Sequence, residues 1–390
     1  MAKTLEVTTK ELKGLLKHVI NNNKFLQEQG KTPLAICVEG EAGIGKTSSI
    51  EQLASELNMQ FVKLNLAQIE EISDLIGFPI RQFQLCKEEE CLWIDEPAVQ
   101  EFQHQGYKFT SNKRMAYCAP EWIAGKGENG ILILDDFTRA DQRFLQACME
   151  LIDRQSYISW KLPKGWTIIL STNPDDGNYQ VTSMDDAQTT RFSTINLKFD
   201  IDCWAKYAEQ AGVDGRCINF LLMTPELVKG KCNPRAITNF FGSISSLQNF
   251  EKSLPIISMM GQGSVGPEFS SMFTTFINNK LDKIIGPHEV LTNKSWDNVK
   301  SQLLDCIGKD NTYRADIASV LCTRLINYTV HYSKDNAIDD NIIKRVTELG
   351  TSDIFAMDLK YMLVKGIYNG NKTKFSRLIL NPEIIKITVK

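Results

Sequence analysis

A glycine-rich segment, GEAGIGKTS at residues 40–48, holds the residue types that bind phosphate groups. It lies between a short apolar run, LAICVEG, and a segment with apolar residues at helical spacing, so it is predicted to join a buried strand to a helix. Lys46 is predicted to reach the β- and γ-phosphates of a nucleotide, and Thr47 to bind Mg²⁺. The predicted nucleotide-binding residues are Gly40, Glu41, Ala42, Gly43, Ile44, Gly45, Lys46, Thr47 and Ser48.

Two further segments place polar side chains directly after apolar runs. In ILILDD, at residues 131–136, Asp135 is predicted to hold Mg²⁺ together with Thr47, and Asp136 to polarise an attacking water. Asn173 follows the apolar run WTIIL and is predicted to contact the γ-phosphate or that water. The alternatives are a surface aspartate pair and an Asn-Pro turn. Together the three segments predict a catalytic site that cleaves a nucleoside triphosphate.

Apolar runs alternate with helical patterns over the first half of the chain and predict the elements that position this site. The runs LAICVEG, FVKLNL, GILILDD, WTIILSTN and STINLKF read as buried strands, which favours a three-layer α/β domain with a mainly parallel sheet. YISWKL and WTIILSTN are predicted to pair through a turn at residues 163–165. Residues 67–129 are predicted to be an insertion of short helices and hairpins, and residues 201–390 to be helical.

The order of the motifs resembles a known family. GEAGIGKT, ILILDDFTRA, STNP, DDAQTTRF and NPRA, over about residues 20–240, are similar to the AAA+ ATPases of the MoxR-like branch. SDLIGFP at 73–79 resembles the start of that branch's helix-2 insertion, and 156–166 resembles the hairpin before its sensor 1 motif. The resemblance implies an AAA+ nucleotide-binding domain at 1–200, followed at 201–390 by a helical lid and a helical extension. It also implies that Asn173 is sensor 1, Arg191 the arginine finger and Arg235 sensor 2.

Elementary chemistry agrees with those arginine roles. Arg191 is far in sequence from the phosphate-binding loop, so its natural target is a phosphate on a neighbouring subunit. Asn233 and Pro234 are a favourable N-cap and first helical residue, which places Arg235 in the first turn of a helix. The alternative for each arginine is a surface salt bridge. The chain departs from many relatives at Asp136, where they carry glutamate.

The resemblance further implies an ATPase that binds ATP and Mg²⁺ and forms a ring, with six subunits as the expected number. It would remodel or assemble a protein partner, and a protein with a von Willebrand factor A domain is one expected partner. A nucleic-acid motor of the same superfamily is the first alternative, and the net charge of −3 argues against it. The second is an ATP-gated structural protein with slow turnover, which the shorter Asp136 side chain favours.

Composition is that of a globular protein, with 43% hydrophobic and 23% charged residues among 390. The sequence has no signal-peptide pattern and no apolar run of membrane-spanning length, which favours the cytoplasm and no membrane partner. The ten cysteines are expected to be reduced thiols. A zinc site at Cys86, Cys91, His104 and Cys118 is the weaker alternative, and KEEE at 87–90 is expected to be a solvated loop.

Overall fold

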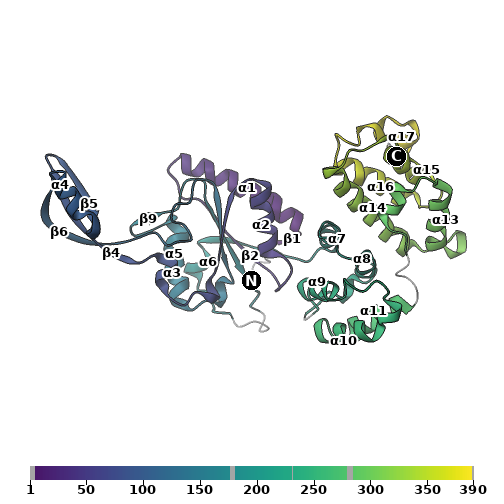
Figure 1. The fold of residues 1–390 in the computed structure, drawn as a ribbon, viewed down its shortest axis with the longest axis horizontal. Helices are drawn as coiled ribbons and strands as arrows, with labels where there is room; N and C mark the ends of the chain where they lie inside the picture. Colours follow the sequence, from purple (N-terminus) through teal and green to yellow (C-terminus); the bar gives the residue numbers. More distant parts are fainter. Residues whose placement is uncertain (1–4, 176–180, 231, 279–283, 389–390) are drawn as a thin grey trace. The chain divides into compact units, whose positions relative to one another are not determined.

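A computed structural model describes residues 5–175, 181–230, 232–278 and 284–388 of the chain. The chain divides into two compact units, Met1–Lys198 and Phe199–Lys390, which are described separately below. Figure 1 shows that the first unit contains the strands of the main sheet and that the second is built of helices.

The first unit is organised around a six-stranded sheet in which every neighbouring pair is parallel. β2, the strand that precedes the glycine-rich loop, lies between β11 and β10 near the centre of the sheet. In order across the sheet, the strands are β1 (Leu5–Val7), β11 (Phe192–Leu197), β2 (Ala35–Glu39), β10 (Thr167–Thr172), β7 (Gly130–Asp135) and β3 (Gln60–Asn65). All six therefore end at the same edge of the sheet, where the polar residues that follow them are brought together.

Helices cover both faces of this sheet. Consecutive residues of a strand point to opposite faces, so a strand of apolar residues has apolar side chains to bury on both. On β7, Ile131 and Ile133 pack with α1 (Thr9–Glu28) and α2 (Lys46–Glu56), in a core distinct from that of the other face. Leu132 and Leu134 pack on the opposite face with α3 (Ile72–Ile76) and α5 (Gln142–Arg154). The structure thus confirms the predicted three-layer α/β fold with a parallel sheet.

Local signals located most of these elements, and two were misjudged. The capping box of Thr8 and Glu11 starts α1. The predicted pairing of YISWKL with WTIILSTN is wrong: β8 (Ser156–Tyr157) pairs with β9 (Trp160–Lys161), whereas β10 lies between β2 and β7. β10 is buried along its whole length inside the parallel sheet, and this burial determines its pairing despite the turn at 163–165. β1, which no sequence pattern predicted, extends the sheet beside β11.

Within the segment 67–129 a second sheet is formed, separate from the first (Figure 1). It is antiparallel, with β4 (Pro79–Lys87) between β5 (Glu90–Asp95) and β6 (Lys108–Tyr117). The helix α4 (Val99–His104) joins β5 to β6, and we call residues 79–117 the arm. Aromatic pairs, Phe83 with Phe109 and Phe102 with Tyr107, pack inside it.

The arm corrects one expectation about the cysteines. Cys86 and Cys91 face each other across the β4–β5 hairpin, with Cα atoms 4.1 Å apart, and form a disulfide. Register brings them together, because a two-residue turn makes residues 86 and 91 direct cross-strand neighbours. The other eight cysteines are free, and five of them are buried. Burial raises the pKa of the Cys37 thiol to about 12, so this thiol stays protonated at neutral pH.

The second unit is helical throughout its described residues, apart from a single bridge between Lys229 and Cys232, and it has two hydrophobic cores. The first core is formed by α7 (Ile201–Gln210), α8 (Gly215–Met223), α9 (Pro234–Ser243), α10 (Leu254–Ser264) and α11 (Pro267–Asn278). The second is formed by α12 (Pro287–Thr292), α13 (Trp296–Ile307), α14 (Ala315–Asp335), α15 (Asp340–Thr351) and α16 (Met357–Gly370), and it is followed by α17 (Pro382–Thr388). Among the described residues, no helix combines the length and the hydropathy needed to cross a bilayer.

Candidate functional site

The glycine-rich loop joins the end of β2 to the start of α2 and exposes backbone N–H groups at the amino end of that helix. Gly45 is the N-cap with φ of +95°, a conformation that side chains rarely adopt. A Cβ on Gly40 would lie 2.6 Å from Ile44 Cδ1 and 2.8 Å from the carbonyl oxygen of Leu197, so no larger residue fits there. The loop therefore has the close backbone approach that phosphate groups require.

Lys46 begins α2, and its side chain turns back over the loop. Its Nζ donates to the carbonyl oxygens of Gly40 at 2.6 Å and Glu41 at 3.0 Å, and to Asn173 Oδ1 at 3.0 Å. Only 8% of Lys46 is exposed, so its charge acts in a partly desolvated space. The contact with Asn173 links the glycine-rich loop to the end of β10, which lies beside β2.

Thr47 and Asp135 supply the oxygen atoms expected of a magnesium site. Thr47 Oγ1 donates to Asp135 Oδ1 at 3.0 Å, and Asp135 Oδ2 pairs with Lys63 Nζ at 2.9 Å. Hydroxyl and carboxylate oxygens are the hard ligands that Mg²⁺ prefers, so these residues fit the predicted metal. Burial acts to raise the pKa of Asp135, but hydrogen bonds from Lys63, Ser171 and Thr47 outweigh it and hold that pKa below its usual 3.8.

Lys63 was not predicted, and its contribution can be measured. Because the pKa of Asp135 is lowered, its ionised form stabilises the fold above about pH 4 and loses that effect as the pH falls through the lowered value. We expect Lys63→Met to reduce the free energy of unfolding at pH 7 by about 1 kcal/mol, and the loss to shrink below pH 4. Urea unfolding at both pH values measures this. Lys198→Met, which removes an exposed ion pair with Glu6, is the control and should change little.

Asp136 lies beside Asn173 at the same edge of the sheet. Asn173 Nδ2 is 3.5 Å from Asp136 Oδ1, and Arg139 Nη1 is 3.8 Å from Asp136 Oδ2. Asp136 has φ of +51°, a left-handed conformation that aspartate tolerates better than most residues. The turn after β7 thereby directs one carboxylate toward Thr47 and the next toward Asn173.

Among the described residues, the contacts of this site include neither of the two predicted arginines. Arg191 precedes β11 and donates to Asp153 Oδ2 and to the carbonyl oxygen of Ala187, both at 2.6 Å, with about a third of its side chain exposed. Arg235 is exposed in the first turn of α9, in the second unit, where Asn233 caps the helix as predicted. In the isolated chain Arg191 therefore forms a salt bridge with Asp153, which is the alternative that the sequence analysis gives for this arginine.

The core of the first unit matches a known family. Residues 35–192 match the model of the AAA domain of the dynein-related subfamily. This part of the chain is similar to an AAA domain. The match begins at β2 and ends at β11, so it includes the glycine-rich loop, both aspartates, Asn173 and Arg191.

Solved structures with partial likeness to the whole chain include variants of RuvB from Thermotoga maritima. One is 13% identical with a TM-score of 0.34, and the alignment covers 72% of this chain and 74% of that one. Another is 13% identical with a TM-score of 0.33, covering 85% of this chain and 88% of that one. No curated protein matches the sequence.

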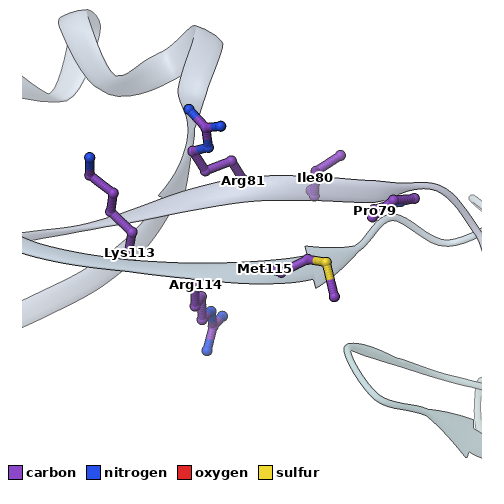
Figure 2. Close-up of a pocket in the computed structure, with 6 residues that line it drawn as sticks. All are labelled: Pro79, Ile80, Arg81, Lys113, Arg114 and Met115. Atoms are coloured by element: carbon purple, nitrogen blue, oxygen red, sulfur yellow. The ribbon is translucent and has the colours of Figure 1, made fainter.

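The first unit also carries a concave surface at the base of the arm, of about 420 Å³ (Figure 2). Arg81 and Lys113 lie on one side of the two strands, and Arg114 points to the other. The register explains this, because Arg81 is opposite Met115 whereas Arg114 is opposite Gln82. Arg114 lies over the ring of Trp93, 4.5 Å from its centroid. This surface combines cationic groups with exposed apolar ones, among them Met115 at 63% exposure.

Proposed function

We propose that this chain hydrolyses Mg-ATP at the edge of the six-stranded sheet where β2, β7 and β10 end. One observation supports this most directly. Lys46, Thr47, Asp135, Asp136 and Asn173 form a continuous set of contacts there, although they come from three separate parts of the sequence. Each of these residue types matches one task in phosphoryl transfer.

The residues would divide the work as follows. The loop N–H groups and Lys46 hold the phosphates, and Thr47 and Asp135 hold Mg²⁺, which when bound neutralises charge on the β- and γ-phosphates. Asp136 orients the attacking water and accepts its proton. Asn173 contacts both Lys46 and Asp136, so it fixes the position of the phosphate-binding amine relative to the water-orienting carboxylate.

We further propose that the chain acts as a ring oligomer, with six subunits as the expected number, and that Arg191 serves the site of the next subunit. An arginine supplied in trans stabilises charge on the transferring phosphoryl group. In the isolated chain Asp153 holds the guanidinium at a partly exposed position, from which it can be released to a stronger anion. Arg235 would contact the phosphates from the helical lid.

Mixing two inactive variants tests the assignment in trans. Lys46→Ala and Arg191→Ala should each lose nearly all ATP turnover. An equal mixture should recover a measurable fraction, because some interfaces then pair an intact loop with an intact Arg191. Phosphate release measured across a concentration series reports this. The control is a mixture of Lys46→Ala with the double variant Lys46→Ala, Arg191→Ala. It should stay inactive, because no interface then contains an intact loop. Robust hydrolysis by a dilute monomer would show that Arg191 does not act in trans.

The substrate we propose is a protein, in the manner of the MoxR-like branch, and a von Willebrand factor A domain protein is one candidate partner. The base of the arm supports a protein substrate, because Arg81 and Lys113 beside exposed Met115 suit a segment with acidic and apolar side chains. We propose that the protein works in the cytoplasm, where its eight free cysteines stay reduced and the Cys86–Cys91 disulfide is open to reduction.

A further inference from the structure

A basic pocket lies at the opposite edge of the sheet from the ATP site. Its volume is about 570 Å³, and its lining includes Pro33, Asn129 and Gly165, which precede β2, β7 and β10. Five cationic side chains and two carboxylates line it, a net charge of +3 in a chain whose total is −3. The cationic residues are Lys24, Lys31, Arg154, Lys161 and Lys164, and the carboxylates are Glu28 and Glu128.

The pocket has a fixed frame and unpaired charges. Gln27 accepts from the Gly165 backbone N–H at 2.8 Å and donates to Gln155 at 2.9 Å, which ties α1 to the segments around β9 and β10. The Asn129 N–H donates to the Lys164 carbonyl at 2.9 Å. None of the five cationic side chains forms an ion pair with any described residue. The pocket therefore presents concentrated positive charge to an anionic group from outside.

Residues 87–90 at the tip of the arm carry three carboxylates and one lysine, Lys87, which is a net charge of −2. Glu88 and Glu89 form the two-residue turn between β4 and β5, and neither carboxylate has an ion-pair partner among the described residues. Glu90 accepts from the Tyr107 hydroxyl at 2.8 Å. The disulfide of Cys86 and Cys91 closes the hairpin directly behind the turn. β4 has nine residues, so the turn stands about 30 Å from the base of the arm, far enough to reach another subunit.

We propose that the acidic tip of the arm, Glu88, Glu89 and Glu90, docks in the basic pocket of a second copy of this chain. A narrow two-residue turn with three adjacent carboxylates matches the pocket in size and in sign of charge. A nucleic-acid strand suits the pocket less well, because no aromatic side chain on which a base could stack is among the described residues that line it. The contact needs neither nucleotide nor turnover, so it goes beyond the proposed function.

A photo-cross-linking amino acid in place of Glu89 tests the contact directly. We expect light to join the arm tip of one chain to segment 24–33 or 154–165 of another in the full-length protein. Mixing chains of ordinary and heavy nitrogen distinguishes links between chains from links within one chain. The yield should fall at least fivefold in 1 M salt, where the Debye length is about 3 Å. It should persist in Lys46→Ala, which separates this proposal from the ATPase assignment. Links confined to single chains would overturn it.

Charge exchange gives a second, independent measurement. Glu88→Lys with Glu89→Lys, and Lys161→Glu with Lys164→Glu, should each weaken self-association at least tenfold in sedimentation velocity. Mixed together, the two double variants should associate again, since one supplies a native pocket and the other a native tip, and their reversed groups also match. Glu70→Lys with Glu71→Lys, an exposed acidic pair outside the arm, is the control and should not weaken it. If the mixture stays dissociated, or if only single-stranded DNA binding responds to the pocket variant, the proposal is wrong.

Discussion

Replacing Lys46 with alanine should weaken ATP binding at least tenfold, which corresponds to about 1.4 kcal/mol. The Lys46 amine is buried at the amino end of α2, where it joins the glycine-rich loop to Asn173. Its removal leaves phosphate charge uncompensated in a partly desolvated site and also frees the loop carbonyls that it holds. Calorimetric titration with ATP and Mg²⁺ measures the change.

The control for this prediction is Lys17→Ala, which removes a half-exposed lysine paired with Glu56 on the helix that Lys46 begins. It should bind ATP as the native chain does. Circular dichroism of both variants separates loss of binding from loss of fold. Native affinity in Lys46→Ala would exclude the glycine-rich loop as the ATP site.

Sequence alone predicts the ATP site well because its residues belong to short segments with strong local signals. Lys46, Asp135 and Asn173 each follow an apolar strand, and parallel strands end at one edge of a sheet. Knowing that the strands are parallel is therefore enough to gather the three side chains. The structure adds the order of the strands, which places β10 between β2 and β7 and so lets Asn173 contact both Lys46 and Asp136.

Features that depend on pairing between distant segments could not be predicted. Lys63 contacts Asp135 only because β3 lies beside β7, and a single lysine in FVKLNL gives no sign of its neighbour. The Cys86–Cys91 disulfide depends on the register of a hairpin that the sequence left unspecified. The error at β10 has the same origin, since a local turn signal was preferred to a pairing 133 residues away in sequence, that of Ile169 with Ile36.

Asp136→Asn should lower single-turnover ATP hydrolysis at least a hundredfold and leave ATP affinity unchanged. A general base contributes about 10²–10⁴-fold to such a step, and an amide cannot accept the proton from water. The substitution should leave the local structure unchanged, because asparagine has the same shape as aspartate and tolerates the left-handed backbone at position 136. Asp141→Asn, at the N-cap of α5, is a matched control and should keep native turnover. Unchanged hydrolysis in Asp136→Asn would assign the water-orienting role to another residue.

Asp136→Glu should raise the turnover rate with ATP affinity unchanged. The water-orienting carboxylate must lie within about 2.6–3.2 Å of the water, and aspartate extends about 1.5 Å less than the glutamate of the resembling family. The backbone has little freedom to close that gap, because Thr47 and Lys63 hold the preceding Asp135 at 3.0 and 2.9 Å. Catalysis in the native chain would then use an additional water and run slowly. Since glutamate is less suited to φ of +51°, thermal unfolding must accompany the kinetics. A folded Asp136→Glu that is slower than the native chain would show that the site is built for the shorter side chain.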